Sequence, residues 1–142
     1  MNQPLKAISV QQPWAWAITH AGKNVENRTS NTHYRGRLAV HAPQHVRRDD
    51  IDALRLAGFH VPTELIVGAI IAVTTLADAH PAADCGGTCS PWAESGRNVW
   101  HWRLEKTTPT SPIACPGKRN VWPLPVDIHE EVVAAIDEGT TS

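Results

Sequence analysis

The feature of this sequence that most constrains its fold is a long apolar stretch in the middle. Residues 65–77 (LIVGAIIAVTTLA) are rich in Ile, Val and Thr, which favour strands, and both alternating faces of the stretch are apolar. The longest apolar run, residues 65–73, is far shorter than the ~20 residues that a helix needs to cross a bilayer. The stretch therefore predicts a central, buried strand, in which Gly68 and the Thr74–Thr75 pair mark bends.

Shorter segments on both sides predict further strands of the same sheet. These segments are residues 6–10, 24–31, 36–42, 99–106 and 121–124. In residues 37–42 and 99–106, alternate side chains are suited to opposite faces of a strand. Pro123 cannot donate to a ladder, which makes the last segment a short edge strand. We expect the segments before residue 43 to join the central strand in one strongly curved, mostly antiparallel sheet, and we expect a connection over residues 107–120.

Three modest helices are predicted beside these strands. The first begins at Pro13 and ends before Gly22, which suits the left-handed conformation common after a helix end. The second covers about residues 49–57, and the third covers about residues 126–138, ends at Gly139 and precedes a short frayed tail. Strands predominate, so the predicted fold class is α+β, a small curved β-barrel with about three flanking helices.

Length, charge and cysteine content narrow the class of protein. The chain has 142 residues, enough for one domain spanning residues 1–142. Its start lacks a signal-peptide pattern and its three cysteines do not pair evenly, so we expect a soluble, cytoplasmic protein without a disulfide framework or a membrane partner. The net charge is −1, but the charges are unevenly distributed along the chain, because residues 126–142 contain five acids and no Lys or Arg. The rest of the chain is basic and predicts a basic face beside an acidic helix.

The stretch from Ile8 to Ala42 resembles the opening of the ASCH family. It contains a strand, a helix with Gln-Pro-Trp, a G-x-K-x-x-E-x-R-like motif one residue shorter than usual, and a strand ending in Val-His. The segments VGAIIAVTTLADAH, WHWRLEK and PGKRNVWPLP also look like this family, so the resemblance covers about residues 6–125. It implies a PUA-like barrel that binds RNA. Some members remove the acetyl group from N4-acetylcytidine, and a ribonuclease activity has been attributed to one.

The charged motif here consists of Lys23, Glu26 and Arg28. In a strand, Glu26 and Arg28 point to the same face, and Lys23 comes from the turn before them. Arginine can fork to a phosphate or a base edge, lysine supplies a point charge, and a carboxylate can accept from an exocyclic amine. The motif thus predicts recognition of a nucleobase with its phosphate. The competing interpretation is a solvent-facing ion pair of little energetic value.

Other residues are candidates for contacts to a base or to phosphates. They are Trp16, Tyr34, Arg35, His41, Lys118 and Arg119. Trp16 lies off the apolar face of its helix, whereas Trp14 lies on it and is expected in the core. His41 faces the motif only if its strand forms a hairpin with the motif strand; otherwise it is a structural histidine. The competing interpretation is core packing for Trp16 and a solvated turn for the segment around Arg35.

A loop with histidine and cysteine predicts a candidate metal site. His80, Cys85 and Cys89 lie close in sequence with a spacing that zinc accepts, and Cys115 or Asp84 would be the fourth ligand. The competing interpretation is a set of free thiols, and the predicted binding function requires no cofactor.

Three functions follow from these observations. The first is a module that binds RNA, another single-stranded nucleic acid or a modified nucleoside in a charged cleft. The second is a hydrolase in which Lys23 and Glu26 are catalytic and activate a water. Lys23 matches the lysine of the deacetylating relatives, but Glu26 stands where they have a threonine, and Glu94 and Glu105 are candidates for their distant glutamate. The third is a protein-interaction adaptor that uses the acidic C-terminal helix.

Overall fold

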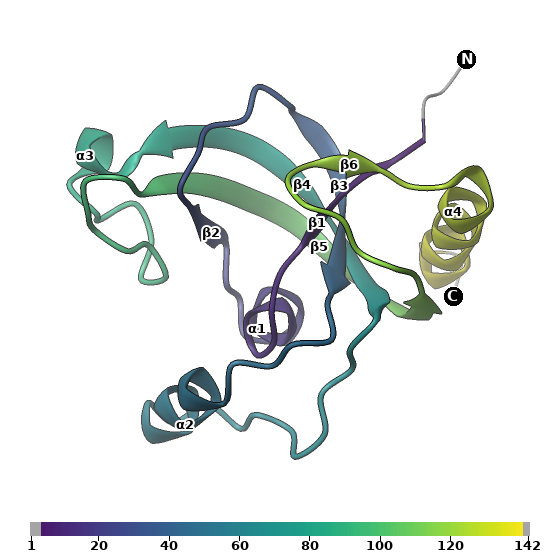
Figure 1. Ribbon diagram of the computed structural model, residues 1–142, viewed down its shortest axis with the longest axis horizontal. Helices are drawn as coiled ribbons and strands as arrows, with labels where there is room; N and C mark the ends of the chain where they lie inside the picture. The colour runs from purple at the N-terminus through teal and green to yellow at the C-terminus, as the bar shows by residue number, and fades with distance from the viewer. Residues whose placement is uncertain (1–3, 141–142) are drawn as a thin grey trace.

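A curved mixed sheet is the frame of the molecule (Figure 1). The computed structural model describes residues 4–140, and these residues form six strands in the order β2-β5-β4-β3-β1-β6. The strands are β1 (Lys6–Ser9), β2 (Val25–Arg28), β3 (Gly36–Ala42), β4 (Ala69–Pro81), β5 (Trp100–Ala114) and β6 (Trp122–Pro123). Only the β1–β3 pair is parallel among these strands of residues 4–140. The prediction that the early segments share one sheet with the central strand is confirmed.

The sheet is curved and mostly antiparallel, as predicted, but it is open, so the predicted barrel is confirmed only in part. Within residues 4–140, the outer strands β2 and β6 do not pair with each other. Both are short, and Pro123 in β6 has no N–H to contribute to a closing ladder. The curvature comes from register shifts between β4 and β5, near Ala72, Thr75 and Asp78, because each irregularity bends the paired strands. Figure 1 shows β4 and β5 as two long arcs that lie side by side.

One strand pairing and the length of one strand differ from the sequence interpretation. β2 pairs with β5, so the hairpin between β2 and β3 does not exist. β5 continues to Ala114 through a segment rich in threonine and proline that was expected to be a connection. The ladder tolerates Pro109, which lies opposite Ala72 beside a register shift, because residues at irregularities need not donate.

Four helices are present in the described residues: α1 (Trp14–His20), α2 (Arg48–Leu56), α3 (Ala82–Cys85) and α4 (Val126–Thr140). The end of α1 follows the prediction, because Gly22 has a φ of 72°. The four-residue helix α3 was not predicted, since a single turn has no periodicity to detect. Helix α4 continues past Gly139, and the frayed tail lies partly outside the described residues. None of the helices in residues 4–140 is long and apolar enough to span a membrane.

The two faces of the sheet carry separate cores. Ile8, Leu38 and Val40 face α1, whereas Ala7 and Ala39, their neighbours in sequence, face α4. This separation follows from the two-residue period of a strand. A third, small cluster of Ile51, Leu54 and Val61 packs α2 against the tryptophans around it. The space between α1, α2 and the ends of β1 and β2 holds the main cleft of the molecule.

Candidate functional site

A charged cleft of about 880 Å³ opens where six parts of the chain meet. They are the end of β1, the start of α1, β2, the start of α2, the loop at residues 91–94 and the segment at residues 118–120. The cleft is lined by five cationic side chains and three carboxylates: Lys23, Arg28, Arg47, Lys118, Arg119, Glu26, Asp50 and Glu94. Its wall is therefore net positive, although the whole chain has a net charge of −1.

Lys23, Glu26 and Arg28 form a connected charged group at the floor of this cleft. Glu26 lies 3.3 Å from the Lys23 ammonium and 3.4 Å from the Arg28 guanidinium. The strand period of β2 brings Glu26 and Arg28 to one side, and the turn at Gly22 delivers Lys23 beside them. The side chains of Lys23, Glu26 and Arg28 are only 3%, 12% and 21% exposed, respectively. The group is thus a largely buried network and not a solvated surface pair.

Backbone carbonyls and aromatic rings hold the two cations in place. The Lys23 ammonium donates to the Val25 carbonyl and lies 5.7 Å from the centre of the Trp14 ring. The Arg28 guanidinium lies 5.0 Å from the Trp102 ring, and its Nη1 donates to the Ser9 carbonyl and to Glu26. The other N–H groups of this guanidinium have no hydrogen-bond partner in the described part of the chain. They are available to a ligand in the cleft.

The sequence favoured Trp16 as the tryptophan of the cleft, but two other tryptophans line it. Trp14 and Trp92 line the cleft, and the Nε1 of Trp14 donates to Asp50 at 2.9 Å. Trp16 packs instead toward α2 and lies 6.4 Å from the His20 ring. The helical period separated Trp16 from the apolar face of α1, but the ring packs against the small cluster under α2 and does not line the cleft. A partner element far along the chain decides which face is exposed.

His41 does not line this cleft but reaches it through Ser9, a residue that sequence reasoning missed. The buried His41 ring accepts a hydrogen bond from the Ser9 hydroxyl at Nδ1, 3.0 Å away, and its Nε2 donates to the Cys115 carbonyl at 2.7 Å. The carbonyl can only accept, so the proton sits on Nε2 and leaves Nδ1 free for the hydroxyl. Burial lowers the pKa of His41 below 6.5, although the bond to Cys115 opposes this. Ser9 lies within the ASCH-like stretch, which is the only sequence signal for it.

The segment after β5 covers this serine–histidine pair. A Cβ at Gly117 would lie 2.5 Å from Cε1 of His41 and 2.7 Å from the Ser9 hydroxyl, so only glycine permits this approach. The next residues, Lys118 and Arg119, are exposed and line the cleft.

Tyr34 and Arg35 lie outside the cleft. The Tyr34 hydroxyl donates to the Arg37 carbonyl, and the Arg35 guanidinium donates to carbonyls of the same turn. These bonds stabilise the turn before β3.

Asn27 attaches the 91–94 loop to β2. Its side-chain Nδ2 donates to the Trp92 carbonyl, and its Oδ1 accepts from the Glu94 amide, both at 3.0 Å. This pair of bonds brings Trp92 and Glu94 to the cleft. Glu105, the other sequence candidate for a distant glutamate, is exposed on β5 and does not line the cleft.

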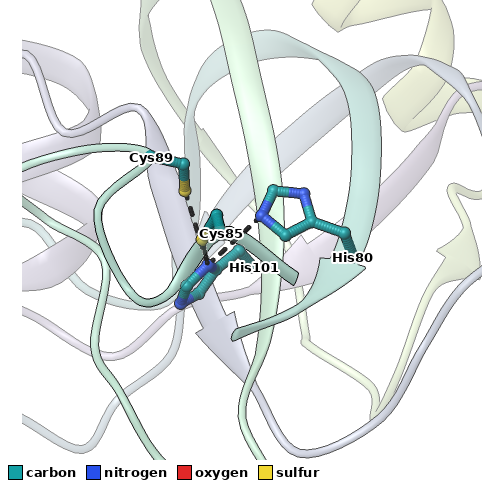
Figure 2. A group of neighbouring side chains, drawn as sticks. All are labelled: His80, Cys85, Cys89 and His101. Carbon is teal, nitrogen blue, oxygen red and sulfur yellow. Dashed lines mark hydrogen bonds between the residues drawn. The ribbon is translucent and has the colours of Figure 1, made fainter. Parts of the chain in front are cut away.

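A second group of chemically active side chains lies at the far end of β4 and β5. His80, Cys85, Cys89 and His101 place their ligand atoms within 4.8 Å of one another, a set that could hold a metal ion (Figure 2). Cys115 and Asp84 were therefore wrong as the fourth ligand. Cys115 is buried elsewhere, where its thiol donates to the Pro116 carbonyl. His101 takes the place because the β4–β5 register sets it opposite His80, which no local pattern reveals.

Burial and hydrogen bonds shift the pKa values of Cys85, Cys89 and His80, and burial together with the bond to Cys85 raises the pKa of Cys89. Burial raises the pKa of the Cys85 thiol, but hydrogen bonds from the Cys89 backbone, the His80 ring and the Cys89 side chain hold that pKa at about 6. The bond to the Asp78 carboxylate raises the pKa of His80, and burial opposes this rise. The group thus favours a thiolate at neutral pH, the form in which cysteine binds metals.

The family model of the ASCH domain matches residues 8–104. Since this is more than half of the chain, the chain belongs to the ASCH domain family. The crystal structure of ASCH from Zymomonas mobilis aligns with a TM-score of 0.64 at 14% identity, covering 94% of this chain and 96% of that one. Two single-residue variants of the Zymomonas protein align with TM-scores of 0.63 and 0.62 at 14% and 13% identity, each over 93% of this chain and over 98% and 96% of theirs. No curated protein matches the chain.

Proposed function

We propose that the charged cleft binds single-stranded RNA or a nucleoside with a modified base. The observation that carries this proposal is the combination of five cationic side chains with two tryptophans around one cleft. Cationic side chains attract phosphates, and bases stack on aromatic rings. Proteins that bind single-stranded nucleic acid combine these two kinds of contact. Membership of the ASCH family supports the same class of ligand. This binding requires no cofactor in the cleft.

The parts of the cleft suit different parts of a nucleotide. Exposed Lys118 and Arg119 are placed for phosphates. Trp92, which also lines the cleft, offers a ring for stacking. The buried group around Glu26 offers a carboxylate and guanidinium N–H groups to a base edge, so it distinguishes bases by their donors and acceptors. Asn27 holds the loop with Trp92, and Glu26 holds Lys23 and Arg28, so these two parts are preorganised from the same short strand.

Replacing Lys118 and Arg119 together by alanine tests the phosphate role. We expect weaker binding of a short labelled single-stranded RNA, and the slope of log Kd against log salt should decrease by about 1.4, or about 0.7 for each lost phosphate contact. Fluorescence anisotropy at several salt concentrations measures both quantities. The control is the Arg35→Ala, Arg37→Ala variant, which removes the same charge outside the cleft and should keep the slope. Equal slopes for the parent and the cleft variant would contradict the proposal.

Hydrolysis of an acylated base is a second candidate function, favoured by the contact between Ser9 and His41. Ser9 lines the cleft, and its hydroxyl donates to a histidine whose other nitrogen is fixed by a carbonyl. This is the arrangement in which a base activates a nucleophile and a third group orients the base. The hydroxyl would attack the amide carbonyl of an N4-acetylcytidine-type substrate while Nδ1 of His41 takes its proton and passes it to the departing amine. The acetyl ester left on Ser9 would then be cleaved by a water that gives its proton to Nδ1 of His41, and return of this proton to the serine oxygen releases acetate and restores the hydroxyl.

The Ser9→Ala variant tests this second function. With N4-acetylcytidine as substrate, we expect the variant to lose at least about a hundredfold in kcat, because its nucleophile is absent. The parent's rate should stay level near neutral pH and fall only below 6.5, since His41 must be neutral and its pKa is lowered. Ser111→Ala, which removes an exposed hydroxyl on β5, is the control and should react like the parent. Undiminished turnover in Ser9→Ala would exclude the serine mechanism without affecting the binding proposal.

A further inference from the structure

We propose that His80, Cys85, Cys89 and His101 form a tetrahedral zinc site that fixes the loop between α3 and β5, and with it one wall of the cleft. The site itself stands independently of what the cleft binds. Figure 2 shows the four side chains converging from the end of β4, from α3 and the loop after it, and from the start of β5.

The backbone brings these four residues together by two separate devices. His80 and His101 are cross-strand partners on β4 and β5. Cys85 is the last residue of α3, and Cys89 follows after a reversal in which Gly86 and Gly87 have φ values of 62° and 74°. Side chains other than glycine rarely adopt this left-handed conformation, so the two glycines are what turns the second thiol back toward the first.

The distances around His101 match a metal better than they match hydrogen bonding. Its Nδ1 lies 3.4 Å from each of three ligand atoms, the two sulfurs and the Nε2 of His80. A neutral or charged imidazole nitrogen has one lone pair or one proton, so it cannot satisfy three partners. Ligand atoms of a tetrahedral zinc lie about 3.3–3.8 Å apart, as follows from bonds of about 2.0–2.3 Å. A cation at the centre therefore accounts for the convergence.

The outer hydrogen bonds of both histidines leave the correct nitrogens facing the centre. Nε2 of His101 lies 2.6 Å from the Glu94 carbonyl, and Nδ1 of His80 lies 2.7 Å from the Asp78 carboxylate. Both partners are acceptors, so these nitrogens carry the protons, and the opposite nitrogens direct their lone pairs inward. Zinc-binding histidines commonly make this bond to a carbonyl or a carboxylate, which orients the ring. Two cysteines and two histidines make a closed set of four ligands, typical of a structural site.

The same bonds connect the metal site to the cleft. The Glu94 carbonyl accepts from His101, and the Glu94 amide donates to Asn27 on β2. Trp92 and Glu94 are thus held from one side by β2 and from the other by a ligand of the zinc. Without the metal, two thiols and two rings would lose their common partner, and the loop would depend on its hydrogen bonds, such as those of Asn27 and of Ser90 with Asn24, and on the contacts of Trp92.

Elemental analysis of the reduced protein, expressed with zinc and purified without chelator, tests the site. We expect about one zinc per chain, the content of a closed four-ligand site. Cys89→Ser, which changes an exposed ligand, should lose most of this zinc, whereas Cys115→Ser, which changes a cysteine outside the cluster, should keep it. The cobalt form of the parent should show thiolate-to-metal absorption that Cys89→Ser lacks. Absence of zinc, or equal zinc in the parent and Cys89→Ser, would overturn the proposal.

Asp78→Ala tests the outer bond without removing a ligand. Loss of such a partner should weaken zinc affinity about 10- to 100-fold, measured by competition with a chelating dye. Hydrogen exchange tests the second half of the proposal. Chelation should speed exchange in residues 86–99 and leave α4 unchanged. If a zinc-loaded and a zinc-free protein exchange alike in this loop, the metal does not fix the cleft wall.

Discussion

Replacing Glu26 by alanine should lower the free energy of unfolding by about 3 kcal/mol, because it leaves a buried ammonium without its counter-ion. The Lys23 side chain is only 3% exposed, and Glu26 is its one acidic partner among the described residues. Its Nζ keeps only the Val25 carbonyl after the change. Urea denaturation followed by circular dichroism measures the loss. From the sequence alone, Glu26 lies on no apolar face and is expected to tolerate substitution, but its burial in the structure changes that expectation.

Two further variants test whether the loss of stability comes from the unpaired buried charge or from any substitution in this part of the sheet. Glu105→Ala removes an exposed carboxylate from the neighbouring strand β5 and should change stability by less than about 0.5 kcal/mol. Adding Lys23→Met to the Glu26→Ala variant should restore part of the lost stability, because an apolar side chain of similar length needs no counter-ion. If Glu26→Ala is as stable as Glu105→Ala, the buried network does not contribute to stability as described.

Replacing Trp92 by alanine should weaken RNA binding by about 5- to 150-fold, because one stacked base contributes about 1–3 kcal/mol. Anisotropy with the same labelled RNA measures this change, and the salt slope should stay as in the parent because no charge is lost. Trp16→Ala is a closely matched control. Both rings pack against the small cluster under α2, but only Trp92 lines the cleft. A larger loss from Trp16→Ala would show that the stacking surface is on the outer side of α1 instead.

Most correct predictions about the fold came from the periodic pattern of apolar and polar side chains within short segments. The alternation in residues 37–42 and the two-sided apolarity of residues 65–77 indicated β3 and β4, and Gly22 ends α1 as expected. The bounds of β4 differ, because it begins at Ala69 and continues to Pro81. Both signals depend on neighbours along the chain. The pairing of β2 with β5 depends on residues far apart in sequence, as does the failure of the sheet to close. Register and closure are decided by packing and by strand length at the edges, which no window of the sequence contains.

In the candidate site, too, the sequence predicted contacts between residues close in the chain and missed contacts between distant ones. Lys23, Glu26 and Arg28 are close in sequence, so the two-residue period of a strand was enough to predict that they lie together. Which side chains line a cleft depends on the whole fold, so the sequence could not tell that Trp14 lines it and that Trp16 packs against the cluster under α2. His101 and Ser9 each gain their partner across a strand pair: His101 lies opposite His80, and Ser9 lies opposite His41. Residues of this kind become visible only once the register is known.

The position of β1 has a consequence for the order in which the protein can be assembled during synthesis. β1 is made first, yet it lies between β3 and the last strand, β6. The backbone of Leu5 also accepts a hydrogen bond from the Leu124 amide and donates one to the His129 ring. A growing chain on the ribosome therefore carries one open edge of β1 until β6 has emerged. An unpaired edge is a template for aggregation, so the nascent chain depends on β6 to close that edge.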